Sequence, residues 1–205
     1  MKSIFKATAI LGSSSVISVV AGLISAKFMA QMIGPNGIGY LAMMQGFLAL
    51  AAMIAGLGVS AGTVKTVAKA VADNDENSVA SNQKAAIALS LISGLTALFL
   101  VSIFSDFLNR LMLDGQGARY EIFLLGIGLV FTLLANCFTG ILNAHHNIKA
   151  LAQIAVANTV LNAGFLIFFV WLSGIKGLIF GIVGGAIFNF LASFYFYKKK
   201  IPTVN

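Results

Sequence analysis

Charged side chains are scarce in this sequence of 205 residues. Asp, Glu, Lys and Arg together account for 9% of the residues, whereas soluble globular domains contain about 25%. Hydrophobic residues account for 59%, and the mean hydropathy is +0.96. This composition excludes a large soluble domain and predicts an all-α, polytopic membrane protein in contact with a lipid bilayer.

Features that enzymes and metal proteins need are also missing. The single cysteine, Cys137, excludes a disulfide framework and a Cys-x-x-Cys site. The adjacent His145 and His146 would point to different sides of a helix and therefore make a poor metal pair. The sequence has no glycine-rich loop ending in Lys-Ser or Lys-Thr to hold a nucleotide. We therefore expect no enzymatic activity, no metal site and no cofactor.

Acidic residues are outnumbered by basic ones, with six Asp and Glu against 13 Lys and Arg, and the net charge is +7. In a soluble protein this excess would suggest a nucleic-acid partner. In a membrane protein it indicates an anionic lipid leaflet or a lipid-linked anion instead. The charge balance leaves these two partners open, and we expect no nucleic-acid binding.

Long apolar runs bounded by charged residues divide the chain. A helix that crosses a bilayer needs about 20 apolar residues, and six such runs are present. We predict six transmembrane helices within residues 1–205, at residues 8–32, 38–64, 85–104, 122–142, 151–171 and 178–197. The first run is too long for the apolar part of a secretory signal, so we expect it to be retained. The mixed segment from Ser105 to Tyr120 suggests a short interfacial helix followed by a turn.

The basic residues predict the orientation of these helices, because cytoplasmic loops carry more Lys and Arg. Nine lie on one set of connections: Lys2, Lys6, Lys65, Lys69, Lys84, Lys149, Lys198, Lys199 and Lys200. Four lie on or towards the other set: Lys27, Arg110, Arg119 and Lys176. We therefore expect both termini in the cytoplasm, which agrees with an even number of crossings.

One full charge falls well inside a predicted helix, at Lys27. A lysine at the centre of a bilayer costs roughly 2.5 to 3.5 kcal/mol. Lys27 lies only about five residues inside the end of its helix, however, so its stem can reach the interface by snorkelling. Two hypotheses stay open, a cation that faces the substrate and an interfacial anchor. Gln31 shares the face of Lys27 one turn later and is placed to hydrogen-bond to it.

Carboxamides recur on the helices predicted at 122–142 and 151–171. Asn136 and Asn143 share one face of the first helix and its end, and Asn158 and Asn162 share one face of the second. We expect both faces to point inward. The asparagines either hydrogen-bond across a helix interface or line a wet cavity, and their spacing does not choose between these roles.

Carboxylates are absent from the predicted helices, since Glu121 lies only at an edge. Coupling to protons or sodium usually relies on a buried carboxylate, so this absence disfavours a drug or cation antiporter. A cavity whose embedded charge is positive favours an anionic substrate instead.

Three segments carry a family resemblance: AGLISAK at 21–27, IGPNGIG at 33–39 and AGLGVSAGTVK at 55–65. They resemble the opening of the Wzx-type polysaccharide flippases of the multidrug/oligosaccharidyl-lipid/polysaccharide exporter superfamily. Within this family, which serves O-antigen and lipopolysaccharide synthesis, they are most similar to members that move the lipid-linked repeat of enterobacterial common antigen. The segments ILNA at 141–144 and KKKIP at 198–202 are similar to the cytoplasmic ends of the family's fourth and sixth helices.

The resemblance implies the N-terminal six-helix lobe of a two-lobe transporter in the bacterial inner membrane. Such a transporter flips an undecaprenyl-pyrophosphate-linked oligosaccharide by alternating access, and a second copy or a separate chain would supply the second lobe. The resemblance also implies that Lys27 lines a cationic cavity, whereas His145 and His146 stand where family members often carry Lys or Arg. The candidate substrate-binding residues are Lys27, Gln31, Asn136, Asn143, Asn158 and Asn162. A drug or cation antiporter of the same superfamily, a non-transporting assembly subunit and an inactive remnant remain alternatives.

Overall fold

The structure is a computed structural model that describes residues 2–56, 59–73, 75–113, 119–145 and 147–201, with side chains placed for all of these except 2–11, 59–60, 111–113 and 119. The described residues form helices and no strand, as the composition predicts. In chain order the elements are α1 (Lys2–Gly56), α2 (Val59–Ala72), α3 (Glu76–Ile103), α4 (Ser105–Leu113), α5 (Arg119–Ala144), α6 (Ile148–Ser173), the 3-10 turn η1 (Gly174–Lys176) and α7 (Gly177–Lys200).

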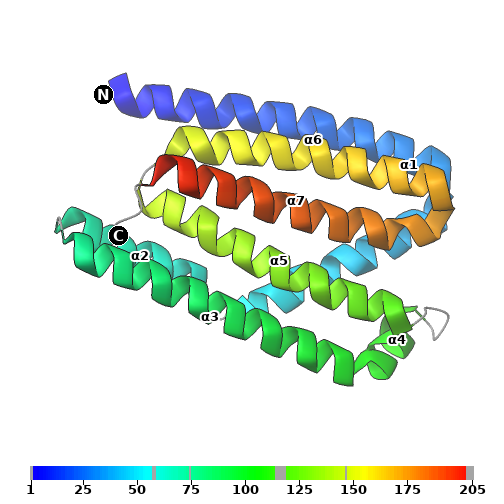
Figure 1. Cartoon of the computed structure of the whole chain (residues 1–205). Helices are drawn as coiled ribbons and strands as arrows, with labels where there is room; N and C mark the ends of the chain where they lie inside the picture. The colour runs from blue at the N-terminus through cyan, green and yellow to red at the C-terminus, as the bar shows by residue number, and fades with distance from the viewer. Residues whose placement is uncertain (1, 57–58, 74, 114–118, 146, 202–205) are drawn as a thin grey trace.

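A sharp reversal at Gly34 divides α1 into a first arm, residues 2–33, and a second arm, residues 35–56 (Figure 1). Gly34 has φ 65° and ψ −174°, a conformation that essentially only glycine adopts. Pro35 disfavours the helical conformation in the residue before it, and it suits the first position of the helix that follows. The connection expected over residues 33–37 is therefore reduced to a single non-helical residue.

Four helical stretches among the described residues are long and apolar enough to cross a membrane: Gly12–Gly56, Glu76–Ile103, Tyr120–Ala144 and Ile148–Lys200. The first and last contain 45 and 53 residues, more than twice the roughly 20 that one crossing needs. Gly34 divides the first and η1 divides the last. The chain is thus a multi-pass membrane protein with six crossing segments.

The helices differ from the predicted ranges mainly at their ends. The helix predicted at 38–64 falls in two described helices, the second arm of α1, which ends at Gly56, and α2 (Val59–Ala72), and residues 57–58 between them lie outside the described part. The helix predicted from residue 85 begins at Glu76. Asp75 explains the earlier start, because its side chain caps α3 by accepting a hydrogen bond from the Ser78 amide at 3.1 Å. The short helix expected after Ser105 is α4, and the turn expected after it lies outside the described residues.

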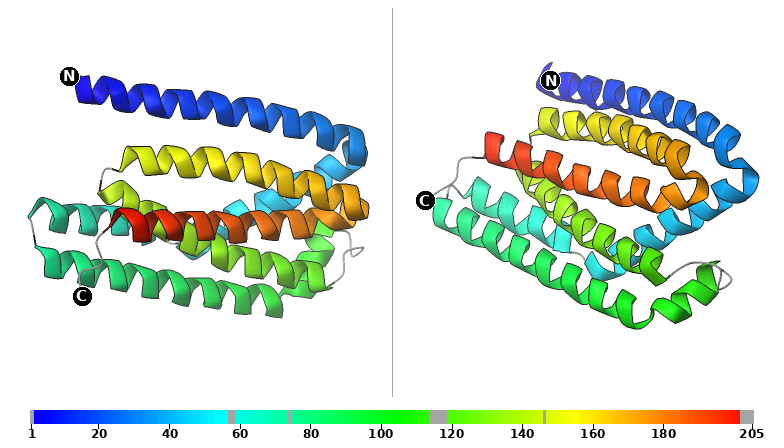
Figure 2. Two further views of the ribbon diagram at one scale, coloured as in Figure 1. Left: turned by 45° about the horizontal axis from the view of Figure 1, so that its top comes forward. Right: turned by 45° about the vertical axis from the view of Figure 1, so that its right-hand side comes forward.

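The core of the lobe forms around α5, which packs between α7 on one side and α3 and α2 on the other (Figures 1 and 2). Ile122, Leu125 and Leu129 of α5 are completely buried. The first arm of α1 lies at the periphery, where it packs against α6. Among residues 12–33, only Ser14 and Met29 are buried, so most side chains of this arm lie at the surface of the lobe.

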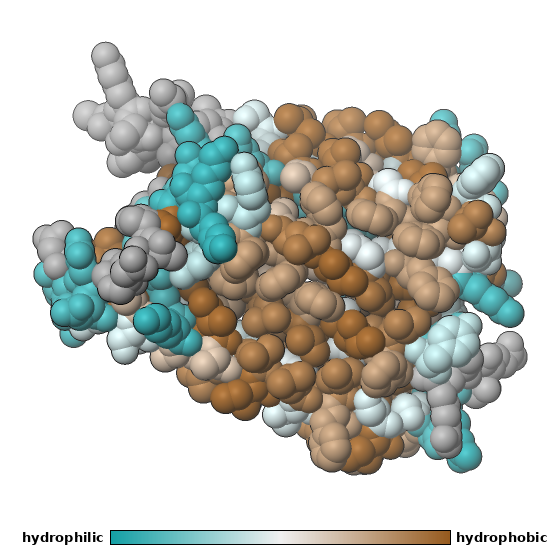
Figure 3. Space-filling model, in the orientation of Figure 1, coloured by the Kyte–Doolittle hydropathy of each residue, from teal (hydrophilic) through white to brown (hydrophobic). Residues whose placement is uncertain are grey.

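The two ends of the bundle differ in their polar groups. One end, here called the basic end, carries the N-terminus, the α2–α3 and α5–α6 turns and the end of α7 with Lys198, Lys199 and Lys200 (Figure 1). The other, the kink end, carries Gly34, α4 and η1. Figure 3 shows a broad hydrophobic band between hydrophilic groups at the two ends, on the face formed by α3, α5, α6 and α7. This pattern matches a lobe whose long axis crosses the bilayer.

Packing between α6 and α7 predicts a strong effect of one added methyl group. An ideal Cβ at Gly181 of α7 would lie 2.9 Å from the Leu166 Cα of α6, whereas a Cβ at Gly164 of α6 would meet nothing within 4 Å. We expect Gly181→Ala to destabilise the lobe by about 1–3 kcal/mol, because the two backbones must separate. Gly164→Ala, the matched control, should be neutral or stabilise by about 0.5–1 kcal/mol, because alanine favours a helix.

The measurement is thermal unfolding of the purified chain in detergent, followed by reaction of a thiol-specific dye with Cys137, which is buried. Equal unfolding temperatures for the two variants would contradict this account of the α6–α7 contact.

The arrangement of the ends also predicts the topology. Because the larger set of basic residues lies towards the basic end, reporter fusions after Lys84, Lys149 and Lys200 should report a cytoplasmic location. Fusions at Asn36 and Gly174, at the kink end, should report the periplasm. The paired use of alkaline phosphatase and green fluorescent protein as reporters gives opposite signals on the two sides. A consistent inversion at all five positions would refute the orientation.

Candidate substrate-binding site

A cavity of about 420 Å³ lies between the two arms of α1 and the middle of α6. We call it the kink cavity, because the reversal at Gly34 brings its walls together. Its polar lining consists of Ser25 on the first arm, Gln45 on the second arm, and Asn158, Thr159 and Asn162 on α6. The apolar lining includes Met29, Leu41 and Leu166. The cavity is thus a neutral space with several hydrogen-bonding groups.

Asn158 and Asn162 lie one helical turn apart on α6, and both line the kink cavity. The Asn158 Oδ1 atom is buried and has no hydrogen-bond partner among the described residues. Asn162 also packs against α7, where an ideal Cβ at Gly185 would lie 2.5 Å from its Nδ2 atom. Asn162 therefore lies both at the α6–α7 interface and at the wall of the kink cavity.

Ser25 and Gln45 were not among the residues expected from the sequence. The sequence could have identified Gln45, because it is the only carboxamide between Tyr40 and Gly56. It could not have identified Ser25, since a serine in an apolar helix is commonly a packing residue. The reversal of α1 at one residue brings both onto the wall opposite Asn158.

Lys27 and Gln31 do not face the kink cavity. Lys27 follows Ser25 by two residues and therefore points to nearly the opposite side of the first arm. Both Lys27 and Gln31 are exposed. The described part of the structure shows neither a hydrogen bond nor an ion pair for Lys27, so the expected bond to Gln31 is not formed.

Asn136 and Asn143 are exposed on α5 and do not point inward as expected. The buried face of this part of α5 is occupied by apolar side chains, among them Phe138, Ile141 and Leu142. The hydroxyl of Thr139, between the two asparagines, donates to the Ala135 carbonyl oxygen at 3.0 Å. The spacing correctly placed Asn136 and Asn143 on one face, but that face is not the one that packs in this lobe.

His145 takes part in a polar cluster at the basic end. Its Nε2 atom lies 3.1 Å from the Nε2 atom of Gln83, which is buried on α3, and the Tyr197 hydroxyl donates to the Gln83 Oε1 atom at 3.1 Å. These contacts connect α3, the α5–α6 turn and α7. His146 lies outside the described residues. No group of three or more His, Cys, Asp or Glu that could hold a metal ion occurs in the part of the chain that was described.

Glu121 lies at the start of the apolar stretch Tyr120–Ala144, and it is engaged in a structural contact. It is 7% exposed and accepts a hydrogen bond of 2.8 Å from the hydroxyl of Tyr40. This bond joins the start of the second arm to the start of α5 at the kink end. Sequence position alone had placed Glu121 at a helix edge, which is where the structure has it.

Comparisons with known proteins identify the family of the chain and proteins that share its fold. Residues 4–204 match the family described as polysaccharide biosynthesis protein. No protein of curated function matches the sequence. The fold is similar to that of MATE in the bent conformation, with a TM-score of 0.80 and 19% identity over 98% of this chain and 46% of that one. It is also similar to a MOP superfamily transporter from Pyrococcus furiosus, with a TM-score of 0.74 and 20% identity over 95% of this chain and 45% of that one.

These identities show a common fold, and the chain spans somewhat less than half the length of each structure that it matches. The six crossing segments share the fold of the matched part of these two structures. On the match over residues 4–204, the chain belongs to the polysaccharide biosynthesis protein family.

Proposed function

We propose that this chain is one lobe of a transporter that flips an undecaprenyl-pyrophosphate-linked oligosaccharide across the bacterial inner membrane by alternating access. The observation that carries the proposal is the separation of polar groups on the first arm of α1. A neutral hydrogen-bonding cavity lies on one side of the arm, and a lysine lies on the exposed side. A lipid-linked oligosaccharide has the matching chemistry, with uncharged sugar hydroxyls beside a charged pyrophosphate.

Lys27 is the proposed contact for the pyrophosphate. It is the only Lys, Arg, Asp or Glu in the apolar stretch Gly12–Gly56. It precedes Gly34 by seven residues, which places it about 10 Å along the helix from the kink end. A cation at this depth is costly without a partner, and an anionic group of the substrate would offset that cost. Gln31 is exposed one turn away and would add a hydrogen bond to the same group.

The kink cavity is the proposed site for sugar hydroxyls. Asn158, Asn162 and Gln45 each carry both donors and an acceptor, as sugar hydroxyls require. The buried Asn158 Oδ1 atom, which has no partner among the described residues, would accept a hydrogen bond from a hydroxyl. Asn136 and Asn143 stay in the proposal as exposed polar groups on α5 that a second lobe or the substrate would cover.

A second lobe completes the proposed transporter. Since six crossings return the chain to its starting side, a second lobe of the same kind is parallel and related by an axis along the membrane normal. A second copy of this chain or a separate chain would supply it. The two lobes would then rock about the substrate, which exposes the cavity first to one side and then to the other.

A drug or cation antiporter is the second candidate of this fold, and its chemistry fits the described residues less well. Such an antiporter needs a carboxylate in the membrane. Glu121 is buried and already accepts the Tyr40 hydroxyl. The Pyrococcus furiosus structure is described by a reverse polarity of its binding pocket and a suggested different function, so pocket polarity is a reasonable guide to substrate class within the fold.

The role of Lys27 is tested by substitution in cells that depend on this chain for surface polysaccharide. We expect Lys27→Ala to lower surface polysaccharide at least tenfold, because a charge-assisted hydrogen bond contributes about 1.5–3 kcal/mol. Lys27→Arg should restore part of the signal, since it keeps the charge with a different shape. Lipid-linked intermediates should accumulate on the cytoplasmic side.

The control is Lys176→Ala, which removes another exposed lysine at the kink end. It should leave surface polysaccharide unchanged, and all three variants should insert into the membrane at equal levels. Normal polysaccharide in the Lys27→Ala strain would sink the assignment and leave Lys27 as an interfacial anchor.

Water access to the kink cavity gives an independent test. In a Cys137→Ala background, we expect Ser25→Cys to react with a small membrane-impermeant thiol reagent, because a cavity that binds sugars must be wet and thiolates form only in water. Ile92→Cys is the control, since Ile92 is 61% exposed in the middle of α3 and would face lipid. Added lipid-linked oligosaccharide should slow the reaction of Ser25→Cys. An unreactive Ser25→Cys, in a variant that still supports polysaccharide export, would rule the cavity out.

A further inference from the structure

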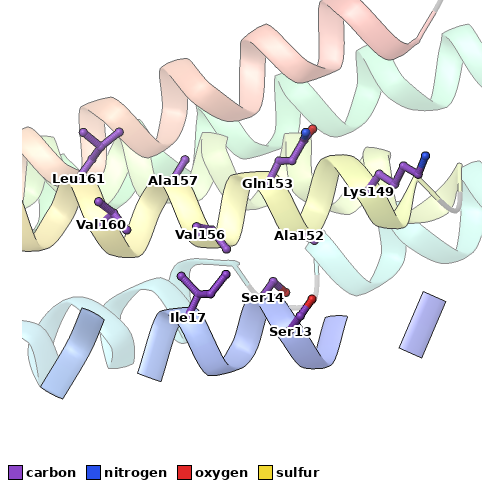
Figure 4. Close-up of a pocket in the computed structure, with 10 residues that line it drawn as sticks. All are labelled: Ser13, Ser14, Ile17, Lys149, Ala152, Gln153, Val156, Ala157, Val160 and Leu161. Atoms are coloured by element: carbon purple, nitrogen blue, oxygen red, sulfur yellow. The ribbon is translucent and has the colours of Figure 1, made fainter. Parts of the chain in front are cut away.

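A second and larger hollow lies between the first arm of α1 and α6 near the basic end, with a volume of about 720 Å³ (Figure 4). We call it the basic-end groove. Ser13, Ser14 and Ile17 reach from α1 towards α6, and Lys149 and Gln153 lie on the part of α6 nearest its N-terminus (Figure 4). Its position distinguishes it from the kink cavity, which lies farther along the same pair of helices.

The groove is amphipathic along its length. Lys149, Gln153, Val156 and Val160 follow one another at spacings of four, three and four residues, so they form one stripe on α6. The polar half of this stripe lies at the basic end, level with Ser13 and Ser14, and the apolar half runs towards the middle of the lobe with Leu161. An occupant must therefore have a polar, anionic head and an apolar chain.

The length of the groove matches one leaflet. From Lys149 to Leu161 α6 rises by about 18 Å, and half of a hydrocarbon core of about 30 Å is about 15 Å. An acyl chain of a phospholipid therefore fits with its phosphate at Lys149. A long polyprenyl chain would extend well beyond the groove, so the dimensions favour a phospholipid.

The basic-end groove leaves apolar space between the first arm of α1 and α6 that a ligand can fill. Of the α6 residues in the groove, Ala152 and Ala157 are small, and Ile17 of the first arm lines the groove and is half-exposed. Empty space between apolar helices forfeits dispersion contacts. A bound chain would restore these contacts along the groove between α1 and α6.

We propose that the basic-end groove binds an anionic phospholipid of the leaflet at that end, with one acyl chain between α1 and α6 and its phosphate at Lys149. Gln153, one turn from Lys149 on the same side of α6, adds a hydrogen-bond donor for the headgroup (Figure 4). The net charge of +7 attracts anionic headgroups towards this end. The lipid site does not depend on the proposed flipping activity, because Lys149 and Lys27 lie towards opposite ends of the lobe.

The test counts bound lipids on the purified full chain. The chain is reconstituted in nanodiscs of phosphatidylcholine with 20 mol% phosphatidylglycerol, extracted gently, and analysed by native mass spectrometry. We expect phosphatidylglycerol to be retained in preference to phosphatidylcholine. Lys149→Gln should lower this retention roughly fivefold, which corresponds to about 1 kcal/mol for one basic residue at an anionic surface.

Two matched controls separate the groove from general surface charge and from misfolding. Lys176→Gln removes a lysine just beyond the other end of α6 and should retain phosphatidylglycerol as the unmodified chain does. Ala157→Trp fills the groove and should abolish retention, whereas Ala155→Trp, at an exposed residue of α6 outside the groove, should not.

Equal retention of the two phospholipids would overturn the proposal, and so would equal losses in the Lys149→Gln and Lys176→Gln variants. Displacement of phosphatidylglycerol by an equimolar amount of undecaprenyl phosphate would also overturn it, because the groove would then belong to the polyprenyl substrate. Loss of surface polysaccharide export without loss of lipid retention would refute neither the groove nor its occupant.

Discussion

The reversal of α1 at Gly34 is the constraint on which the candidate site depends. A backbone at φ 65° and ψ −174° is open to glycine, and Pro35 both excludes a helical Gly34 and starts the second arm. Because the turn takes one residue, the two arms leave it close together, and Ser25 and Gln45 meet α6 around one cavity. The same turn leaves the opposite face of the first arm, with Lys27, outside the lobe. A looser connection would separate the arms and remove the cavity.

The division between a neutral interior and an exposed cation follows from the energetics of charge in a bilayer. A lysine inside the lobe would need a buried counter-charge, and the apolar stretches of this chain contain no carboxylate beyond Glu76 and Glu121 near their ends. Asparagine and glutamine cost less to bury and offer both donors and acceptors. The lobe therefore holds polar groups without charge in the kink cavity. Lys27 stays on the exposed face of the first arm.

The sequence predicted the number and approximate positions of the crossing segments, because long apolar runs have few alternatives in a bilayer. The predicted helix ends were less exact, because local residues determine where a helix begins. Asp75 caps α3, which therefore begins at Glu76, and Pro35 starts the second arm earlier than expected. Periodicity placed Asn158 with Asn162 and Asn136 with Asn143, but it did not reveal which face of each helix packs. The face that packs is determined by residues distant in sequence, as where Gly185 of α7 lies close to the Asn162 side chain of α6. Ser25 was missed for the same reason.

The lobe is packed unevenly, with a buried core around α5 and an exposed first arm of α1. The position of the first arm is therefore the part of the structure that depends most on lipid, ligand or protein outside the lobe. Around α5, residues such as Ile122 and Leu125 are completely buried, so the core of the lobe is determined by its own side chains. The first arm has only Ser14 and Met29 buried among residues 12–33, and the kink cavity and the basic-end groove both lie along it. Its position must therefore depend on whatever fills those hollows and covers its exposed face. Lys27 and one wall of the kink cavity are both on this arm, so a change in the position of the arm would move the two together.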